Sequence, residues 1–250
     1  MKDTDRFAEL IRNAKKIAVL TGAGMSTESG IPDFRSPSGL YRTVTSEELF
    51  DITAFASRYK EFYEVMGPFY IAMMEARPNA GHLALASLEK EFGKEVIVAT
   101  QNIDGLHTEA GSTKVFEVHG TMATLSCRRC GCQRPHTEFV EVFRAGQVPR
   151  CPECKDVMRP DIVFFGENLP EEALEESMAA FEECDLAVVL GTSLKVYPAA
   201  GLPSLRKRGV PLVIVNREPT SADYSAELVF HDSIGEVLQR SVAAWRSWNC

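Results

Sequence analysis

The sequence lacks an apolar run long enough to cross a membrane. Its longest clean runs, such as Leu186–Leu190, are far shorter than the roughly 20 residues that a membrane helix needs. The start of the chain also lacks the positively charged segment and apolar stretch of a secretory signal, and carries Asp3 and Asp5 instead. We therefore expect a cytoplasmic protein with no membrane partner.

Positive charge is also in short supply. The 250 residues contain 27 lysines and arginines against 35 aspartates and glutamates, which gives a formal net charge of −8. This balance argues against a broad basic face that binds nucleic-acid phosphates. Internal repeats and low-complexity tracts are absent, and the 45% of apolar and 25% of charged residues are ordinary for a globular protein. Since no coiled coil or exposed apolar helix is apparent, we expect a monomer.

Short apolar runs predict strands that are buried on both faces of a parallel sheet. The first is Ile17–Thr21, which ends at Gly22. Runs of the same kind recur at residues 96–100, 115–118, 186–190 and 212–215. Helical patterns separate most of them, so the predicted fold class is α/β, with a Rossmann-like, doubly wound parallel sheet and right-handed crossovers.

Two of the predicted helices have clear starting signals. Asn79 is suited to cap a helix, because its side chain can accept hydrogen bonds from the first backbone N–H groups. Pro170 and the two glutamates after it open another helix, in which we expect Leu174, Met178 and Phe181 to face the core.

A glycine-rich turn follows the first predicted strand. In Thr21-Gly22-Ala23-Gly24-Met25-Ser26, the glycines let backbone N–H groups approach a phosphate. The dehydrogenase fingerprint needs a third glycine where Thr27 stands, and an acidic residue about 20 positions further on is missing. An ordinary dehydrogenase is therefore disfavoured, and a simple glycine turn remains an equal alternative.

Four of the seven cysteines form two Cys-x-x-Cys pairs. Their spacing is typical of two knuckles that share one tetrahedral Zn²⁺ ion. Because all four ligands would be thiolates, no coordination position stays open, and the zinc would be structural. Cys132 is a spare thiol nearby that could compete as a ligand. The predicted ligands are Cys127, Cys130, Cys151 and Cys154.

Two stretches interrupt the alternation of strands and helices. Residues 33–77 have the pattern of loops and helices, and residues 121–158 contain the cysteine pairs but no long apolar segment. We expect this helical insertion and this zinc-binding module to form a smaller lobe. The large, Rossmann-like domain would then consist of residues 1–32, 78–120 and 159–250, and ligands would bind in the crevice between the lobes.

Polar residues follow the second and third predicted strands. Thr100-Gln101-Asn102-Ile103-Asp104 ends the second run, and His119 follows the third. Because the carboxyl ends of parallel strands line the binding crevice, we expect Asn102, Asp104 and His119 to open onto one site. His119 would act as a general base near neutral pH. For Asn102 and Asp104, capping of the next helix remains an equal alternative.

These motifs, in this order, resemble the sirtuin family of NAD-dependent protein deacylases in its short bacterial and archaeal form. The match covers nearly the whole chain and includes Gly30–Arg35 and Val163–Glu167. The resemblance accounts for the incomplete fingerprint, because this family binds NAD for cleavage and not for hydride transfer. The residues that it implies for NAD binding are Gly22, Ala23, Gly24, Thr27, Asp33, Phe34, Arg35, Gln101, Asn102, Ile103, Asp104, His119, Gly191, Thr192, Ser193, Asn216, Arg217 and Asp232.

The resemblance also implies a substrate and catalytic roles. His119 would be the general base and Asn102 would order the ribose region, while Ile103 and Asp104 would hold the nicotinamide carboxamide. The substrate would be an acyl-lysine protein or peptide whose extended backbone pairs with two strand edges. The residues implied to contact it are Val163, Phe164, Phe165, Gly166, Glu167 and Val196.

The products implied are nicotinamide, O-acyl-ADP-ribose and free lysine. The branch of the family that removes succinyl and malonyl groups carries a Tyr-x-x-Arg pair for the acyl carboxylate. Here Tyr63 is followed three residues later by Met66, so we expect uncharged acyl groups to be preferred. Mono-ADP-ribosyl transfer, and a non-catalytic NAD or ADP-ribose sensor, are the alternative functions on the same fold.

Overall fold

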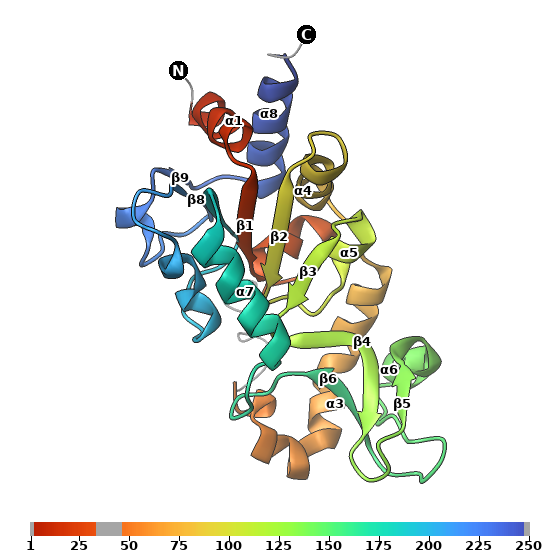
Figure 1. Ribbon diagram of the computed structural model, residues 1–250. Coiled ribbons are helices and arrows are strands. Elements are labelled where there is room, and N and C mark those ends of the chain that lie inside the picture. The colour runs from red at the N-terminus through yellow and green to blue at the C-terminus, as the bar shows by residue number, and fades with distance from the viewer. Residues whose placement is uncertain (1–2, 34–46, 248–250) are drawn as a thin grey trace.

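A six-stranded parallel sheet forms the larger part of the molecule (Figure 1). The computed structural model describes residues 3–33 and 47–247. The strand order is β3-β2-β1-β7-β8-β9, so the chain starts at the centre and winds outward to each edge in turn. This confirms the predicted Rossmann-like, doubly wound fold. The strands are β1 (Lys16–Thr21), β2 (Glu95–Thr100), β3 (Lys114–Glu117), β7 (Leu186–Leu190), β8 (Leu212–Val215) and β9 (Leu228–Phe230).

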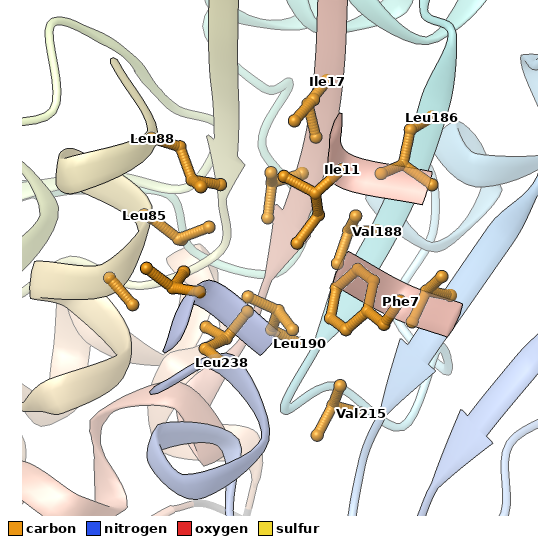
Figure 2. Packing of buried hydrophobic residues seen from close by; sticks show 14 of the residues in the cluster. Phe7, Ile11, Ile17, Leu85, Leu88, Leu186, Val188, Leu190, Val215 and Leu238 are labelled. Atoms are coloured by element: carbon orange, nitrogen blue, oxygen red, sulfur yellow. The ribbon is translucent and has the colours of Figure 1, made fainter. Parts of the chain in front are cut away.

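Helices cover both faces of this sheet. α1 (Asp3–Asn13), α4 (Ala80–Lys90) and α8 (Ile234–Ser247) pack on one face, and α7 (Glu171–Glu183) packs on the other with the short helix η4 (Ala199–Leu205). Side chains alternate along each strand, so that Val19 and Val188 face the first layer while Leu20 and Val189 face the second. Figure 2 shows Ile11 of α1 between Ile17 of β1 and Val188 of β7, and Phe7 of α1 beside Val188, all in the first layer.

Two details of the large domain differ from the prediction. β9 was not predicted, because three half-buried residues give too short a pattern. The prediction that Met178 faces the core was wrong, since 38% of its surface is exposed. Ser177 faces inward instead, and its hydroxyl donates to the carbonyl of Ala173 at 2.6 Å, which lets a small polar residue be buried there.

A second, antiparallel sheet lies in the smaller lobe, at the lower end of Figure 1. β4 (Gly120–Cys127) pairs with both β5 (Gln133–Pro135) and β6 (Met158–Ile162). α3 (Ile52–Glu75) and α6 (Val140–Arg144) share an apolar core with this sheet. The Tyr63 hydroxyl donates to the Met158 carbonyl at 2.7 Å, which ties α3 to β6.

β6 crosses the domain boundary that we expected between residues 158 and 159. Gly120 is paired with Ile162, so the small sheet extends from residue 120 to residue 162. β4 therefore begins directly after His119, at the point where the chain leaves the large sheet.

Candidate active site

A cavity of about 1360 Å³ opens at the carboxyl end of the parallel sheet. Its wall combines the loops after β1, β2, β3, β7 and β8 with Met66 and Met73 of α3 in the smaller lobe and with the segment Val163–Glu167, which follows β6. The cavity thus lies at the edge of the sheet where parallel α/β folds bind ligands.

The glycine turn after β1 packs directly against the turn after β7. η1 (Ala23–Ser29) begins inside this turn, and a Cβ atom added to Gly24 would lie 2.8 Å from the Gly191 Cα atom. A Cβ atom on Gly191 would lie 2.3 Å from the backbone nitrogen of Met25. Gly24 and Gly191 therefore satisfy a packing requirement as well as lining the cavity. Thr27, at the position of the missing third glycine, donates its hydroxyl hydrogen to the Gly24 carbonyl at 3.0 Å.

Asn102, Ser26 and Asp104 form one hydrogen-bonded cluster in the cavity wall. The Asn102 amide donates to Ser26 Oγ and to the Gly22 carbonyl, both at 3.1 Å. Ser26 in turn donates to Asp104 Oδ2 at 2.6 Å. Asp104 Oδ1 accepts from the backbone of Leu106 at 3.0 Å, at the start of α5 (Leu106–Ala110). Asp104 thus supports this helix and faces the cavity, whereas the Asn102 side chain joins the glycine turn to the cluster.

The backbone of Gln101 determines the tautomer of His119. His119 Nδ1 lies 3.1 Å from the Gln101 carbonyl oxygen, which can only accept, so Nδ1 carries the hydrogen in the neutral ring. Nε2 therefore keeps its lone pair. Since His119 lines the cavity, this nitrogen can take a proton from a bound group.

Burial shifts the pKa values of His119 and Asp104 toward their neutral forms. Burial lowers the pKa of His119 from its ordinary value of 6.5, and the hydrogen bond to Gln101 opposes this only in part. Burial raises the pKa of the Asp104 carboxyl, while hydrogen bonds from Ser26 and Leu106 oppose the shift. The lowered pKa of His119 favours the neutral ring, which can act as a base near neutral pH.

The segment Val163–Glu167 is anchored to the catalytic region through its backbone. Val163 N–H donates to the His119 carbonyl at 2.8 Å, and Phe165 N–H donates to the Phe50 carbonyl at 2.7 Å. Glu167 accepts from the backbone of Phe164 at 2.9 Å and forms an ion pair with Arg159. This segment is thus a braced edge of the cavity, from which Phe165 remains 41% exposed.

The four predicted zinc ligands lie together in the small lobe. All four sulfur atoms lie within 4.8 Å of one another, with Cys127 and Cys154 at 3.4 Å and Cys130 and Cys151 at 3.6 Å. These separations are too long for disulfides and agree with the roughly 3.8 Å between sulfurs that share one Zn²⁺ at about 2.3 Å. Cys132 is not part of the cluster. The donor set therefore fits one structural zinc ion.

Each knuckle turns through a residue with positive φ directly after its second cysteine. Gly131 has a φ of 72° and donates its N–H to the Cys127 carbonyl. Lys155 holds the same place in the second knuckle with a φ of 64°, and its N–H donates to the Cys151 carbonyl. The second turn uses a lysine where glycine is favoured.

The cavity brings together the predicted NAD-binding and peptide-binding residues that the structure describes. Phe34 and Arg35 lie outside the described residues. Sequence reasoning did not assign Ser26, although it stands in the glycine motif and touches both Asn102 and Asp104. It also missed several other wall residues, which are Glu28, Ile31, Pro32, Phe50, Met73, Asn168, Leu169, Glu171, Leu174, Tyr197, Pro198 and Glu218.

We expect one zinc ion per chain, held by the four-cysteine cluster. Chelation should lower the melting temperature, because the small lobe would lose its metal cross-link. Metal analysis of Cys127→Ser should show loss of zinc, whereas Cys132→Ser, which changes a thiol outside the cluster, should retain it. A wild-type chain that keeps its full thermal stability without zinc would contradict this assignment.

We also expect His119 to titrate below pH 6.5 in the free protein. Burial penalises the imidazolium, so the neutral base should persist as the pH falls through 6.5 and become protonated only at lower pH. An NMR titration of the ring measures this directly, and the spectrum of His119→Gln identifies the resonance. A pKa at or above 6.5 would show that the ring is more hydrated than its position indicates.

Known proteins are similar in sequence to this chain over nearly their full length. The Sir2 family model matches residues 22–198. The NAD-dependent protein deacetylase of Thermotoga maritima is 43% identical over 235 residues, covering 94% of this chain and 95% of the relative. The NAD-dependent protein deacylase 2 of Archaeoglobus fulgidus is 42% identical, with coverage of 95% and 94%.

Solved structures of Sir2 proteins superimpose closely on this chain. One holds a deacetylated p53 peptide and 3′-O-acetyl ADP ribose, with a TM-score of 0.91, 42% identity and coverage of 97% of this chain and 98% of the other. Another holds a p53 peptide and NAD⁺, with a TM-score of 0.87, 41% identity and the same coverage. From the family match, the sequence identity and the shared fold together, this chain belongs to the Sir2 family.

Proposed function

We propose that this chain is an NAD-dependent protein-lysine deacetylase that releases nicotinamide, O-acyl-ADP-ribose and free lysine. The observation that carries the proposal is that one cavity joins the glycine turn, the Asn102–Ser26–Asp104 cluster, Nε2 of His119 and the backbone-anchored segment Val163–Glu167. Relatives named deacetylase or deacylase support it, as do neighbouring structures that hold NAD⁺ with a peptide, or acetyl ADP ribose with a deacetylated peptide.

In this proposal, the end of the cavity near β1 and β7 holds the dinucleotide. The turn of Gly22 to Gly24 and the loop of Gly191 to Ser193 present backbone and hydroxyl groups suited to phosphate and ribose. Gln101 donates to Thr192 Oγ1 at 3.0 Å, which joins the loops after β2 and β7. Asn216, Arg217 and Asp232 extend the same wall toward the loop after β9.

Asp104 and Ile103 would hold the nicotinamide carboxamide, and Asn102 would order the ribose beside it. Ser26 limits the freedom of both Asn102 and Asp104, so the groups that receive the cofactor are positioned before it binds. His119 would then remove a proton from a ribose hydroxyl through Nε2, because Nδ1 is occupied by the Gln101 carbonyl.

The acyl-lysine peptide would pair with the edge at Val163–Glu167 on one side and with Val196 on the other. Main-chain pairing of this kind favours an extended peptide with modest dependence on its side chains. The N–H of Val163 donates to the His119 carbonyl, so a backbone hydrogen bond fixes the proposed peptide-binding segment next to the proposed base.

The wall of the cavity favours an uncharged acyl group. Met66 lies in the wall, while Tyr63 is buried in the core of the small lobe and does not line the cavity. Arg217 is the only lysine or arginine among the described wall residues. Among the described residues of the small lobe, a succinyl carboxylate would thus find no cation in the cavity wall, which is unfavourable for a buried charge.

We propose that the chain acts as a monomer in the cytoplasm. We also propose that it does not bind nucleic acid directly, because its net charge of −8 disfavours contact with phosphates. The described residues contain no helix that is both long enough and apolar enough to span a bilayer.

Nicotinamide release tests the reaction directly. We expect the purified chain to release nicotinamide from NAD together with O-acetyl-ADP-ribose when an acetyl-lysine peptide is present. His119→Ala should lose at least about 100-fold in turnover, because it lacks the proposed base. Circular dichroism and calorimetric NAD titration control for folding and cofactor binding. Near-normal deacetylation by His119→Ala would refute the role of His119, and transfer of labelled ADP-ribose to protein would favour the alternative transferase.

Acyl selectivity gives a second prediction. The ratio kcat/KM should be similar for acetyl-lysine and propionyl-lysine peptides and at least about 100-fold lower for the succinyl-lysine peptide, since an unpaired buried carboxylate costs several kcal/mol. Matched peptides that differ only in the acyl group provide the control. Efficient desuccinylation would show that a cation reaches the acyl end of the cavity.

A further inference from the structure

Two buried histidines lie next to each other outside the cavity wall. His82 of α4 is 0% exposed and His107 of α5 is 2% exposed. Their ring centroids are 4.7 Å apart, with an angle of 59° between the ring planes. The reaction proposed above uses neither ring.

The backbone determines the tautomer of His82. The N–H of Asn79 donates to His82 Nδ1 at 3.3 Å, completing a capping box at the start of α4. A ring nitrogen that accepts this hydrogen must be unprotonated, so the neutral ring carries its hydrogen on Nε2. His82 Nε2–H is buried and has no hydrogen-bond partner among the described residues.

Two threonine hydroxyls couple to the tautomer of His107. Thr21 Oγ donates to Thr100 Oγ at 2.8 Å, and His107 Nε2 lies 3.1 Å from the same Thr21 oxygen. With the two hydroxyl hydrogens reversed, so that Thr100 donates to Thr21, His107 Nε2 accepts from Thr21. With the hydrogen of Thr21 directed to Thr100, His107 Nε2 donates to Thr21. His107 Nδ1 is then an acceptor, and it too is buried without a partner among the described residues.

In this second arrangement the two unpartnered atoms are complementary, because His82 offers a hydrogen and His107 offers a lone pair. The proposal adopts this arrangement because it allows both buried atoms to be satisfied. Both rings are held neutral, since burial lowers the pKa of His82 to about 4 and that of His107 to about 3. A donor and an acceptor on adjacent rings, each costly to leave unsatisfied, can be satisfied together, directly or through one buried water.

Hydrogen bonds connect each histidine of the pair to segments that line the proposed NAD site. On one side, the Asn79 amide donates to the Met25 carbonyl at 2.8 Å and to Ser29 Oγ at 3.0 Å, which holds η1 against α4. On the other side, the N–H of Asn102 donates to Thr100 Oγ at 3.1 Å. The histidines thus stand between the glycine turn and the backbone of Asn102.

We propose that His82 and His107 act as one unit of positioning residues, a hydrogen-bonded relay with fixed tautomers that holds η1 and the Asn102 backbone in the arrangement that binds NAD. The proposal rests on the proposed function, because it concerns the same cofactor site. Neither ring touches the reacting groups, and their effect passes through Asn79 on one side and through Thr21 and Thr100 on the other.

NMR of the unmodified protein tests the tautomers. In a protein labelled with ¹⁵N-histidine, two-bond ¹H–¹⁵N correlation spectra should show the hydrogen on Nε2 for both rings at neutral pH. Spectra of His82→Asn and His107→Gln assign the two rings. A hydrogen on His107 Nδ1, or a charged ring at neutral pH, would overturn the relay.

Kinetics and NAD affinity test the coupling. His82→Asn keeps an acceptor near the Nδ1 position, and His107→Gln keeps a donor near the Nε2 position, so each removes chiefly the unpartnered atom. We expect each to raise KM for NAD about tenfold and KM for the acetyl-lysine peptide less than about twofold. The double variant should be no worse than the poorer single variant, because the two rings act together.

Leu83→Ala is the matched control, because Leu83 is the next residue of α4 and is 54% exposed. It should leave both KM values unchanged. Additive effects of the two substitutions, equal changes in both KM values, or wild-type kinetics in both variants would overturn the proposal. If the unmodified chain fails to deacetylate the peptide, the proposed function fails. The relay is then still tested by the NMR tautomers and by calorimetric NAD affinities of the variants.

Discussion

The parallel register of the large sheet is the constraint on which the site depends. Thr21 is paired with Thr100 and with Leu190, Thr100 with Glu117, and Leu190 with Val215. These five strands therefore end at one level. The residues directly after β1, β2, β7 and β8 line one cavity, and His119 joins them two residues after β3. A slip of one residue between β1 and β2 would turn every side chain of one strand to the opposite layer and separate the glycine turn from Asn102.

The two lobes meet at the proposed base. His119 ends the path from β3, and Gly120 begins β4 with a φ of 74°. A Cβ atom on Gly120 would lie 2.2 Å from the Asp161 carbonyl oxygen, so the approach of β4 to β6 requires glycine there. The zinc cluster and the aromatic core of the small lobe stabilise this sheet, and thereby the strand edge that faces His119. A zinc ion held by the four cysteines, none of which lines the cavity, would thus contribute to its shape.

Much of the fold was accessible from the sequence because its signals are local. The buried strands have continuous apolar runs, so most of their boundaries were predicted closely. The Cys-x-x-Cys spacing predicted the four cysteines that lie together in the structure. The failures involve packing between distant segments. Met178 is apolar yet lies on the outer side of α7. Ser26 looked like part of a turn, and only the approach of β2 to β1 makes it the hydrogen-bond partner of Asp104.

The sequence by itself determined the order of motifs, the α/β class, the four thiolates and the kinds of side chain available at each strand end, because these depend on residue type and short spacing. The tertiary structure decided which nitrogen of His119 is free, since that depends on the Gln101 carbonyl from a neighbouring strand. It also decided that His82 and His107 lie together, although 25 residues separate them in the chain. Hydrogen bonds and burial across distant segments set protonation and orientation, and no local pattern encodes them.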